Sequence, residues 1–462
     1  MELAALDLAR WQFGSTTIYH FLFVPLSIGL APLVALLETA HYRTGDAGYR
    51  RLAAFFSTLF LINFAMGVAT GLVQEFQFGM NWSEYSRYVG DVFGVPLALE
   101  GLLAFFMEST FLGLYMFGRG RLPRAVHLTT IWLVAIGSVL SALMILAANS
   151  WMQHPVGYQI NPTTHHAEMT DVWAVLFNPT LLLAFPHTVL ASFLTGGLFM
   201  LGVSAFQLLR GRDSELFRKS ARLAVVWCLI SSFLVVLVGD SLGQLVGAEQ
   251  PMKTAAAEAL YQTQAPAEFS LFAIGTPNGG HLVVNVTVPY VLSVLVTRSF
   301  SGKVQGINNL QAAYQTQFGP GNYIPFVPVT YWGFRIMVGI GFLALGFSLV
   351  GLYLFRRGRI DTWKWFQRAA IVMVPLPFVA NSAGWLFTEM GRQPWVVFGL
   401  LKTQDAVTPS AGIWSVALSL GGFVLLYLIL AVIEGWLMWR TILGGAPSEA
   451  KLDDDSHLEL AY

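Results

Sequence analysis

Long apolar stretches separated by short polar connections run through most of the sequence. Nine of them reach the roughly 20 residues that an α-helix needs to cross the hydrocarbon core of a bilayer. They cover residues 14–39, 53–76, 93–118, 125–149, 181–208, 219–245, 329–356, 367–390 and 411–439. The pattern predicts an all-α, polytopic membrane protein with about nine transmembrane helices.

The composition agrees with a membrane protein. Of the 462 residues, 55% are hydrophobic and only 11% are charged, which is far less charge than a soluble protein of this size carries. The formal net charge is zero, which argues against nucleic acid as a partner. The single cysteine, Cys228, excludes a disulfide framework and a cysteine-based metal cage.

Arginine and lysine are unevenly distributed between the two sets of connections that alternate along the chain. One set, which includes the C-terminal tail, holds 18 of these residues and the other holds 7. Short cytoplasmic connections are enriched in positive charge. The distribution therefore predicts an N-terminus outside the cytoplasm and a cytoplasmic C-terminus.

Residues 246–328 form an unusually long connection on the predicted outer side. Connections of this length are usually functional or mobile. Leu282–Val288 alternates in a way that predicts a short strand. Lys253 and Glu258 lie in a short stretch of good helix formers, and considered alone they would be an exposed pair without a role.

Glu389 is a carboxylate at the end of the apolar stretch 367–390, where we expect it to lie inside the membrane. A charge at that depth costs about 2.5 to 3.5 kcal/mol on insertion scales, so a cation, a metal or a proton should balance it. Arg392 follows three residues later, and we expect it at the membrane edge.

Of the nine histidines, only His20 and His187 lie well within predicted helices. A single buried histidine is more often structural than a ligand, and Met337 alone is by default a flexible core residue. The predicted orientation, however, places both histidines, Met337 and Glu389 in the outer part of the membrane. Histidine and methionine together are axial ligands of electron-transferring haem. Arg335 would pair with a haem propionate, and the haem would be held non-covalently because the chain has no Cys-x-x-Cys-His motif.

Glu100 and Glu108 lie eight residues apart in the predicted helix 93–118. This spacing puts them about 12 Å apart along the axis and on roughly the same face. Ser141 and Asn149 repeat the spacing in the next helix. Such groups in series could carry protons through an apolar bundle. The alternative is a polar seam between helices, worth less than about 1 kcal/mol per contact, and it is about as plausible for Ser141 and Asn149.

Several motifs distributed from one end of the chain to the other resemble subunit I of the cytochrome bd-type quinol oxidases. They are Tyr19-His20-Phe21-Leu22-Phe23-Val24-Pro25, Asn63-Phe64-Ala65-Met66-Gly67-Val68-Ala69-Thr70-Gly71, Glu75-Phe76-Gln77-Phe78-Gly79-Met80-Asn81-Trp82, Glu100-Gly101 with Phe105-Phe106-Met107-Glu108-Ser109-Thr110-Phe111, Arg335-Ile336-Met337, and Gly391-Arg392-Gln393-Pro394-Trp395. The chain departs from some relatives in its short outer loop and in Ser241, which stands where a second acid would follow Asp240.

The resemblance implies three non-covalently bound haems. His187 and Met337 resemble the axial pair of a low-spin haem b that takes electrons from quinol. His20 and Glu389 resemble the protein ligands of a high-spin haem b and a haem d, with the distribution between the two haems left open. We further expect the side chains of Arg335, Arg392, Trp385 and Arg10 to contribute to haem binding.

The resemblance also implies the roles of five other side chains. Glu100 would lie beside the high-spin haems, Glu108 and Ser141 would form the cytoplasmic proton route, and Lys253 and Glu258 would belong to the quinol-oxidising loop. The assignment of Lys253 and Glu258 to this loop reverses their interpretation as an exposed pair without a role.

The implied enzyme is a quinol:oxygen oxidoreductase in the cytoplasmic membrane of a bacterium. It would oxidise ubiquinol or menaquinol, reduce oxygen to water, and separate charge without pumping protons. Residues 1–245 would form a six-helix haem-binding region, 246–328 the extracytoplasmic quinol-oxidising loop, 329–445 a three-helix region and 446–462 a cytoplasmic tail. A second membrane subunit is expected, a small single-span subunit is left open, and lipid surrounds the bundle.

Two alternatives remain at this point. In a haem-free ion or solute transporter, Glu100, Glu108, Arg335 and Glu389 would instead line a pathway. In a closer variant of the oxidase, a third haem b would replace haem d, because axial ligands do not determine macrocycle chemistry.

Overall fold

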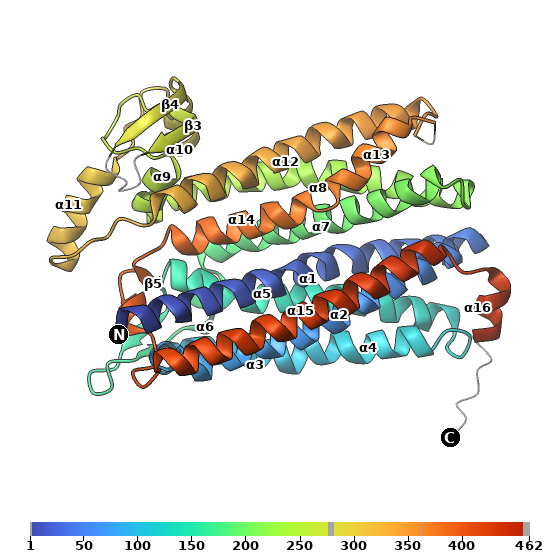
Figure 1. Cartoon of the computed structure of the whole chain (residues 1–462), viewed down its shortest axis with the longest axis horizontal. Helices are drawn as coiled ribbons and strands as arrows, with labels where there is room; N and C mark the ends of the chain where they lie inside the picture. The colour runs from blue at the N-terminus through green and yellow to red at the C-terminus, as the bar shows by residue number, and fades with distance from the viewer. Residues whose placement is uncertain (1, 276–280, 361, 456–462) are drawn as a thin grey trace.

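The computed structural model describes residues 2–275, 281–360 and 362–455. Within these ranges, nine helical segments are long and apolar enough to cross a membrane, which confirms the predicted fold class (Figure 1). The segments are α1 (Glu2–Thr44), α2 (Ala47–Met80), α3 (Ser83–Leu99) continuing into α4 (Phe106–Phe117), α5 (Arg124–Gln153), α7 (Pro179–Leu209), α8 (Ser214–Glu249), α12 (Val327–Arg356), α13 (Lys364–Met373) continuing into α14 (Leu376–Met390), and α15 (Ile413–Gly444).

The helices extend beyond the apolar stretches that predicted them, because polar residues at their ends continue the backbone hydrogen bonding. The largest difference is in α1, which begins at Glu2 rather than at residue 14. His20 consequently lies near the middle of its helix. A π-helical turn, Glu100–Phe105, joins α3 to α4, whereas the sequence predicted an uninterrupted α-helix.

The remaining elements are short. They are the antiparallel pair β1 (Tyr158–Ile160) and β2 (Ala167–Met169), α6 (Val172–Leu176), α9 (Pro251–Ala257), the antiparallel pair β3 (Phe269–Gly275) and β4 (Leu282–Val288), α10 (Val291–Thr297), α11 (Ile307–Phe318), the antiparallel pair β5 (Trp395–Val397) and β6 (Leu401–Lys402), a 3-10 turn (Thr403–Asp405) and α16 (Glu449–Asp455). The bounds of β4 are those of the predicted strand. Residues 456–462 of the predicted tail lie outside the described residues.

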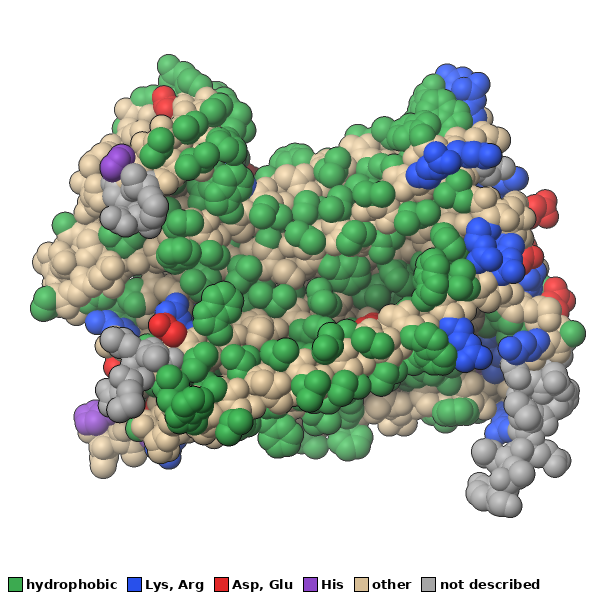
Figure 2. All heavy atoms as spheres, viewed as in Figure 1, with side chains coloured by type: hydrophobic (Ala, Val, Ile, Leu, Met, Phe, Trp, Pro, Cys, Tyr) green, Lys and Arg blue, Asp and Glu red, His purple; other side chains and the backbone are tan. Residues whose placement is uncertain are grey.

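The two ends of the bundle differ in charge. Lysine and arginine side chains gather at one end, here called the basic end, which contains the connections α1–α2, α4–α5, α7–α8 and α12–α13 (Figure 2). The opposite end, called the loop end, carries the long segment 246–328. The cytoplasmic assignment of the basic end stays a prediction from the positive-inside rule.

Two glycines allow α1 and α7 to touch backbone to backbone. A Cβ atom on Gly29 would lie 2.0 Å from the carbonyl oxygen of Ser192, and one on Gly196 would lie 2.3 Å from the carbonyl carbon of Gly29. Any side chain at either position would push the helices apart. This contact fixes the relative height of two neighbouring helices at the centre of the bundle.

Candidate functional site

His20 and His187 lie at corresponding heights on these two helices. Each histidine precedes its contact glycine, Gly29 or Gly196, by nine residues. Both α1 and α7 run from the loop end to the basic end (Figure 1), so each histidine lies about 14 Å along the axis from the same contact. The shared height arises from this contact rather than from equal distances to the helix ends.

The ring of His20 is oriented by its neighbours on α2. Its Nδ1 atom lies 2.9 Å from the hydroxyl oxygen of Thr70. The bare backbone of Gly71 lies against the ring, since a Cβ there would be 3.2 Å from Cε1 of His20. A hydrogen bond at one ring nitrogen fixes the orientation of a metal-binding imidazole. Nε2 is therefore the atom that could bind iron.

His187 packs against Gly239 of α8, where a Cβ atom would lie 3.0 Å from Cε1 of the ring. The carbonyl group of Val235 interacts electrostatically with the imidazole. Nδ1 is nevertheless buried without a partner of hydrogen-bond geometry in the described parts of the chain. Met337, on α12, lies with its thioether sulfur against Gly384 of α14, where a Cβ atom would come within 2.7 Å.

Glu389 pairs with a cation, which is one of the three balancing partners expected from the sequence. One carboxylate oxygen, Oε2, forms an ion pair with Nη2 of Arg392. The other, Oε1, accepts hydrogen bonds from Asn149 (2.9 Å) and Gln153 (3.4 Å) of α5. Arg392 is only 2% exposed, so its guanidinium is buried within the protein.

The amide of Gln153 joins this cluster to the long loop. Its Oε1 atom accepts hydrogen bonds from Nζ of Lys253 (2.6 Å) and Nε2 of Gln250 (3.1 Å). Lys253 is 3% exposed. Burial, together with the nearby charge of Arg392, lowers the pKa of the Lys253 ammonium to about 7. Gln153 and Gln250 escaped the sequence analysis because a neutral amide carries no signal of its own.

Glu258 is buried as well, so the interpretation of Lys253 and Glu258 as an exposed pair was wrong. Its carboxylate accepts hydrogen bonds from Nη2 of Arg335 (2.6 Å) and from the backbone amide of Ser270 (3.2 Å). Burial raises the pKa of Glu258 to about 7, although Arg335 and Ser270 act in the opposite direction.

Arg335 connects the first turns of α12 to the loop. Its Nε atom donates a hydrogen bond to the carbonyl of Ser270 (2.6 Å), and its guanidinium lies over the rings of Phe269 and Tyr331. A protein carboxylate, Glu258, thus already provides an anion for Arg335, which the sequence expected to pair with a propionate. Nη1 of Arg335 still lacks a partner among the described residues.

The two glutamates near the π-helical turn both face α5. Ser141 donates a hydrogen bond to Glu100 (2.7 Å), and Ser138 donates to Glu108. Ser138 was missed, although it lies three residues before Ser141 and therefore on the same helix face. Asn149, which the sequence placed in this series, instead contacts Glu389.

Three further residues were singled out from the sequence. Trp385 lies on α14, four residues before Glu389. Arg10 forms an ion pair with Asp7 in the preceding turn of α1, at 3.9 Å. Asp240 forms an ion pair with Arg298 of the long loop. This carboxylate therefore has a cationic partner, although Ser241 follows it in place of a second acid.

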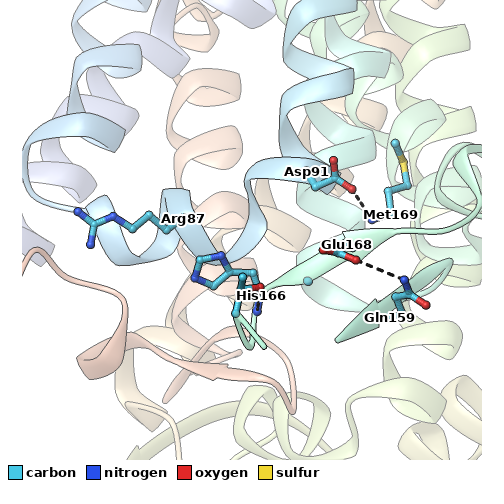
Figure 3. A pocket seen from close by; sticks show the side chains of 8 residues that line it. Arg87, Asp91, Gln159, His166, Glu168 and Met169 are labelled. Atoms are coloured by element: carbon cyan, nitrogen blue, oxygen red, sulfur yellow. Dashed lines mark hydrogen bonds between the residues drawn. The ribbon is translucent and has the colours of Figure 1, made fainter. Parts of the chain in front are cut away.

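A surface pocket at the loop end lies apart from these residues. It is lined by α3 and by the β1–β2 hairpin, with Asp91 accepting a hydrogen bond from the backbone amide of Met169 (2.7 Å) and Gln159 donating to Glu168 (3.3 Å) (Figure 3). None of the predicted site residues lines it. These contacts attach the hairpin to α3.

The donor groups suit haem better than a bare metal ion. Within the described ranges, no three histidine, cysteine, aspartate or glutamate side chains come together as a metal site would require. Iron in a porphyrin needs only one or two protein ligands, which His20, His187, Met337 and Glu389 could supply singly or in pairs. The Nη1 atoms of Arg335 and Arg392 are buried and unpartnered in the described structure, as suits donors to propionates.

The nine-span bundle and the side chains in it that could bind iron are the features of a membrane protein that carries haem. The model of the family "Cytochrome bd terminal oxidase subunit I" matches residues 8–446. The chain belongs to this family, which confirms the expected enzyme class, a quinol:oxygen oxidoreductase of the bacterial cytoplasmic membrane. The haem-free transporter is thereby set aside.

Relatives match almost the whole chain. It is 46% identical to cytochrome bd ubiquinol oxidase subunit 1 of Bacillus subtilis (strain 168), covering 96% of this chain and 95% of the relative. It is 40% identical to cytochrome bd-II ubiquinol oxidase subunit 1 of Escherichia coli (strain K12), covering 94% and 96%. The solved bd oxidase from Geobacillus thermodenitrificans superposes with a TM-score of 0.86 at 28% identity, covering 95% of this chain and 98% of that one.

Proposed function

We propose that this chain oxidises quinol at its loop end and reduces oxygen to water, and that it would hold a low-spin haem b, a high-spin haem b and a haem d, which would supply the electron transfer and the oxygen chemistry. The observation that carries the proposal is the buried Glu258–Arg335 pair beside the first turns of α12, which also bears Met337. The first two relatives described above are named ubiquinol oxidases, and another, 30% identical, is named a putative menaquinol oxidase. The quinol is therefore ubiquinol or menaquinol.

His187 and Met337 would hold the low-spin haem b, and His20 and Glu389 would serve the two high-spin haems. Bound haem supplies one-electron transfer and the reduction of oxygen. The chain's own part is to orient the ligands. The hydrogen bond between His20 and Thr70 and the contact of Met337 with Gly384 support this role. Arg335 and Arg392, each with a free buried Nη1 atom in the described structure, would bind propionates, and Trp385 and Arg10 are proposed as further haem contacts.

At the loop end, Glu258 would accept a proton from the quinol hydroxyl. A general base works best when its pKa lies near the working pH, and burial raises the pKa of Glu258 to about 7. The bonds from Arg335 and the Ser270 amide hold the carboxylate in place. Lys253, whose pKa burial lowers to about 7, would bind the second quinol oxygen and exchange protons in the same pH range.

Protons consumed at oxygen would enter from the basic end. Glu108 with Ser138, and then Ser141 with Glu100, form two hydrogen-bonded steps where α4 and the π-helical turn face α5. Quinol protons would leave at the loop end. Because the two half-reactions exchange protons with opposite sides of the membrane, charge separates without a pumping cycle.

The remaining assignments follow from this arrangement. Residues 1–245 and 329–445 would form the membrane regions, 246–328 the quinol-oxidising loop and 446–462 the cytoplasmic tail. The family name designates one subunit of a larger enzyme, so we propose a second membrane subunit as partner, with a small single-span subunit as a possible addition, and lipid around the assembly.

A reduced-minus-oxidised visible spectrum of the purified complex tests the proposal, followed by acid-acetone extraction of the haems. We expect low-spin and high-spin b-type bands together with a haem d band. Extraction of two different macrocycles would support the presence of haem d. Extraction of haem b alone would mean that a third haem b takes the place of haem d. A colourless preparation from iron-replete cells would refute the whole scheme.

A further inference from the structure

The β3–β4 hairpin of the long loop has two chemically different faces. One face carries Phe272, Ile274, Val284 and Val286, and we call these four residues the outer hairpin face. Phe272 pairs with Val286 and Ile274 pairs with Val284 across the strands. Side chains at paired positions point to the same side of a sheet. All four are between 41% and 50% exposed, which is unusual for a continuous apolar set on a surface in water.

The opposite face is turned toward the protein at Ser270 and Ala273, which are 2% and 4% exposed. Ser270 pairs with Thr287, and Ala273 pairs with Asn285. The Ser270 hydroxyl hydrogen-bonds to Asn285 (2.8 Å) and to the Tyr331 hydroxyl (2.9 Å), next to the Glu258–Arg335 pair. The shift in register between Ser270 and Phe272 inserts one extra residue, and this bulge turns Phe272 to the outer face.

The outer hairpin face continues into the apolar surface at the start of α12. Phe272 makes an edge-to-face contact with Trp332 in the first turns of α12, with ring centroids 5.4 Å apart. Tryptophan at the end of a spanning helix typically marks the boundary between hydrocarbon and headgroups. In Figures 1 and 2 the lobe that contains the hairpin projects sideways beyond the loop end of α12, and hydrophobic side chains cover its flank toward the spans.

We propose that the outer hairpin face lies in the headgroup and upper acyl region of the lipid bilayer, as a shallow membrane anchor of the long loop. A deep position is excluded because, among the described residues, no further strand pairs with this two-stranded sheet. Apart from the Ser270 amide and carbonyl, which bond to Glu258 and Arg335, the backbone groups at its edges need water or headgroups as partners. The hairpin thus presents its apolar face to lipid while its other face holds the Glu258–Arg335 pair. This inference rests on the membrane-spanning bundle and not on the quinol site.

Nitroxide labels on single introduced cysteines test the anchor in the complete oxidase, assembled with its partner subunits in nanodiscs of phosphatidylcholine and phosphatidylglycerol. The labelled variants are Val284→Cys and Val286→Cys, and the matched control is Thr287→Cys on the opposite face. The native Cys228 is fully buried, and the unsubstituted complex checks that it takes no label. Collision rates with oxygen, which concentrates in lipid, are compared with those of a water-soluble nickel chelate.

We expect labels at 284 and 286 to collide several-fold more with oxygen than with the chelate, relative to the label at 287. Equal or greater collision with the chelate would overturn the proposal by placing the face in water. Low collision rates with both reagents would overturn it too, since the face would then be covered by a protein subunit. Haem spectra of each variant establish that the complex is assembled.

Discussion

Replacing Glu258 with glutamine separates the charge of this side chain from its hydrogen bonding. Glutamine has the same shape and keeps an oxygen that can accept from Arg335 and from the Ser270 amide, which lie 2.6 and 3.2 Å from the carboxylate. What the substitution removes is the proton-accepting group. The loop should therefore remain docked while quinol oxidation fails.

The magnitude follows from the environment of the carboxyl group. Burial raises the pKa of Glu258 from 4.5 to about 7, and each pKa unit is about 1.4 kcal/mol. The shift of about 2.5 units makes the carboxylate roughly 300-fold stronger as a proton acceptor than an exposed glutamate, or about 3 kcal/mol. Loss of a general base typically lowers a rate by about 10²- to 10⁴-fold, and we expect a loss in this range.

The sign of the pH dependence also follows. Only the ionised carboxylate accepts a proton, so kcat/KM of the unsubstituted enzyme should rise with pH through about 7. The same raised pKa means that Glu258 favours the folded loop below its unfolded value of 4.5 and that this contribution is lost as pH rises through about 7. In Glu258→Gln both dependences on this group should disappear.

The assay is oxygen consumption with a water-soluble quinol, measured between pH 5.5 and 9 at several quinol concentrations, where the pH range brackets a pKa of about 7. The matched control is Glu268→Gln, an exposed carboxylate of the same hairpin segment that accepts a hydrogen bond from Thr287 and should behave as the unsubstituted enzyme. If Glu258→Gln kept its activity within twofold and retained the rise near pH 7, the assignment of Glu258 as the base would be wrong.

Three further changes test the rest of the site. Glu108→Gln should slow turnover at the oxygen site by at least about tenfold with unchanged haem content, and normal oxygen consumption would exclude this route. His187→Ala should abolish the low-spin haem b band, so a normal spectrum would refute the ligand assignment. Gly384→Ala would bring a Cβ atom within 2.7 Å of the Met337 sulfur, and the low-spin band should shift or weaken. Gly339→Ala on the same helix as Met337, with no atom within 4 Å of the added Cβ, is its control; equal spectra for the two variants would count against Met337.

The local pattern of apolar and polar residues was sufficient to predict much of the fold of this protein. A run of apolar residues long enough to cross the bilayer specifies a helix by itself, because no other backbone conformation satisfies its own hydrogen bonds in lipid. The nine spans and the strand β4 were therefore predictable. Intramembrane polar residues such as His187 and Glu389 were conspicuous for the same reason, and the longer motifs identified the family.

Only the tertiary structure decided which of these groups meet. Lys253 and Glu258 belong to a loop whose local sequence favours exposure, yet docking against α5 and α12 buries both and shifts the pKa of each to about 7. Arg335 takes Glu258 as its partner, and Asn149 turns to Glu389 instead of extending the series from Ser141. Periodicity specifies the face of a helix on which a side chain lies. The partner on the opposing helix depends on helix height and rotation, which close contacts such as Gly29–Gly196 set.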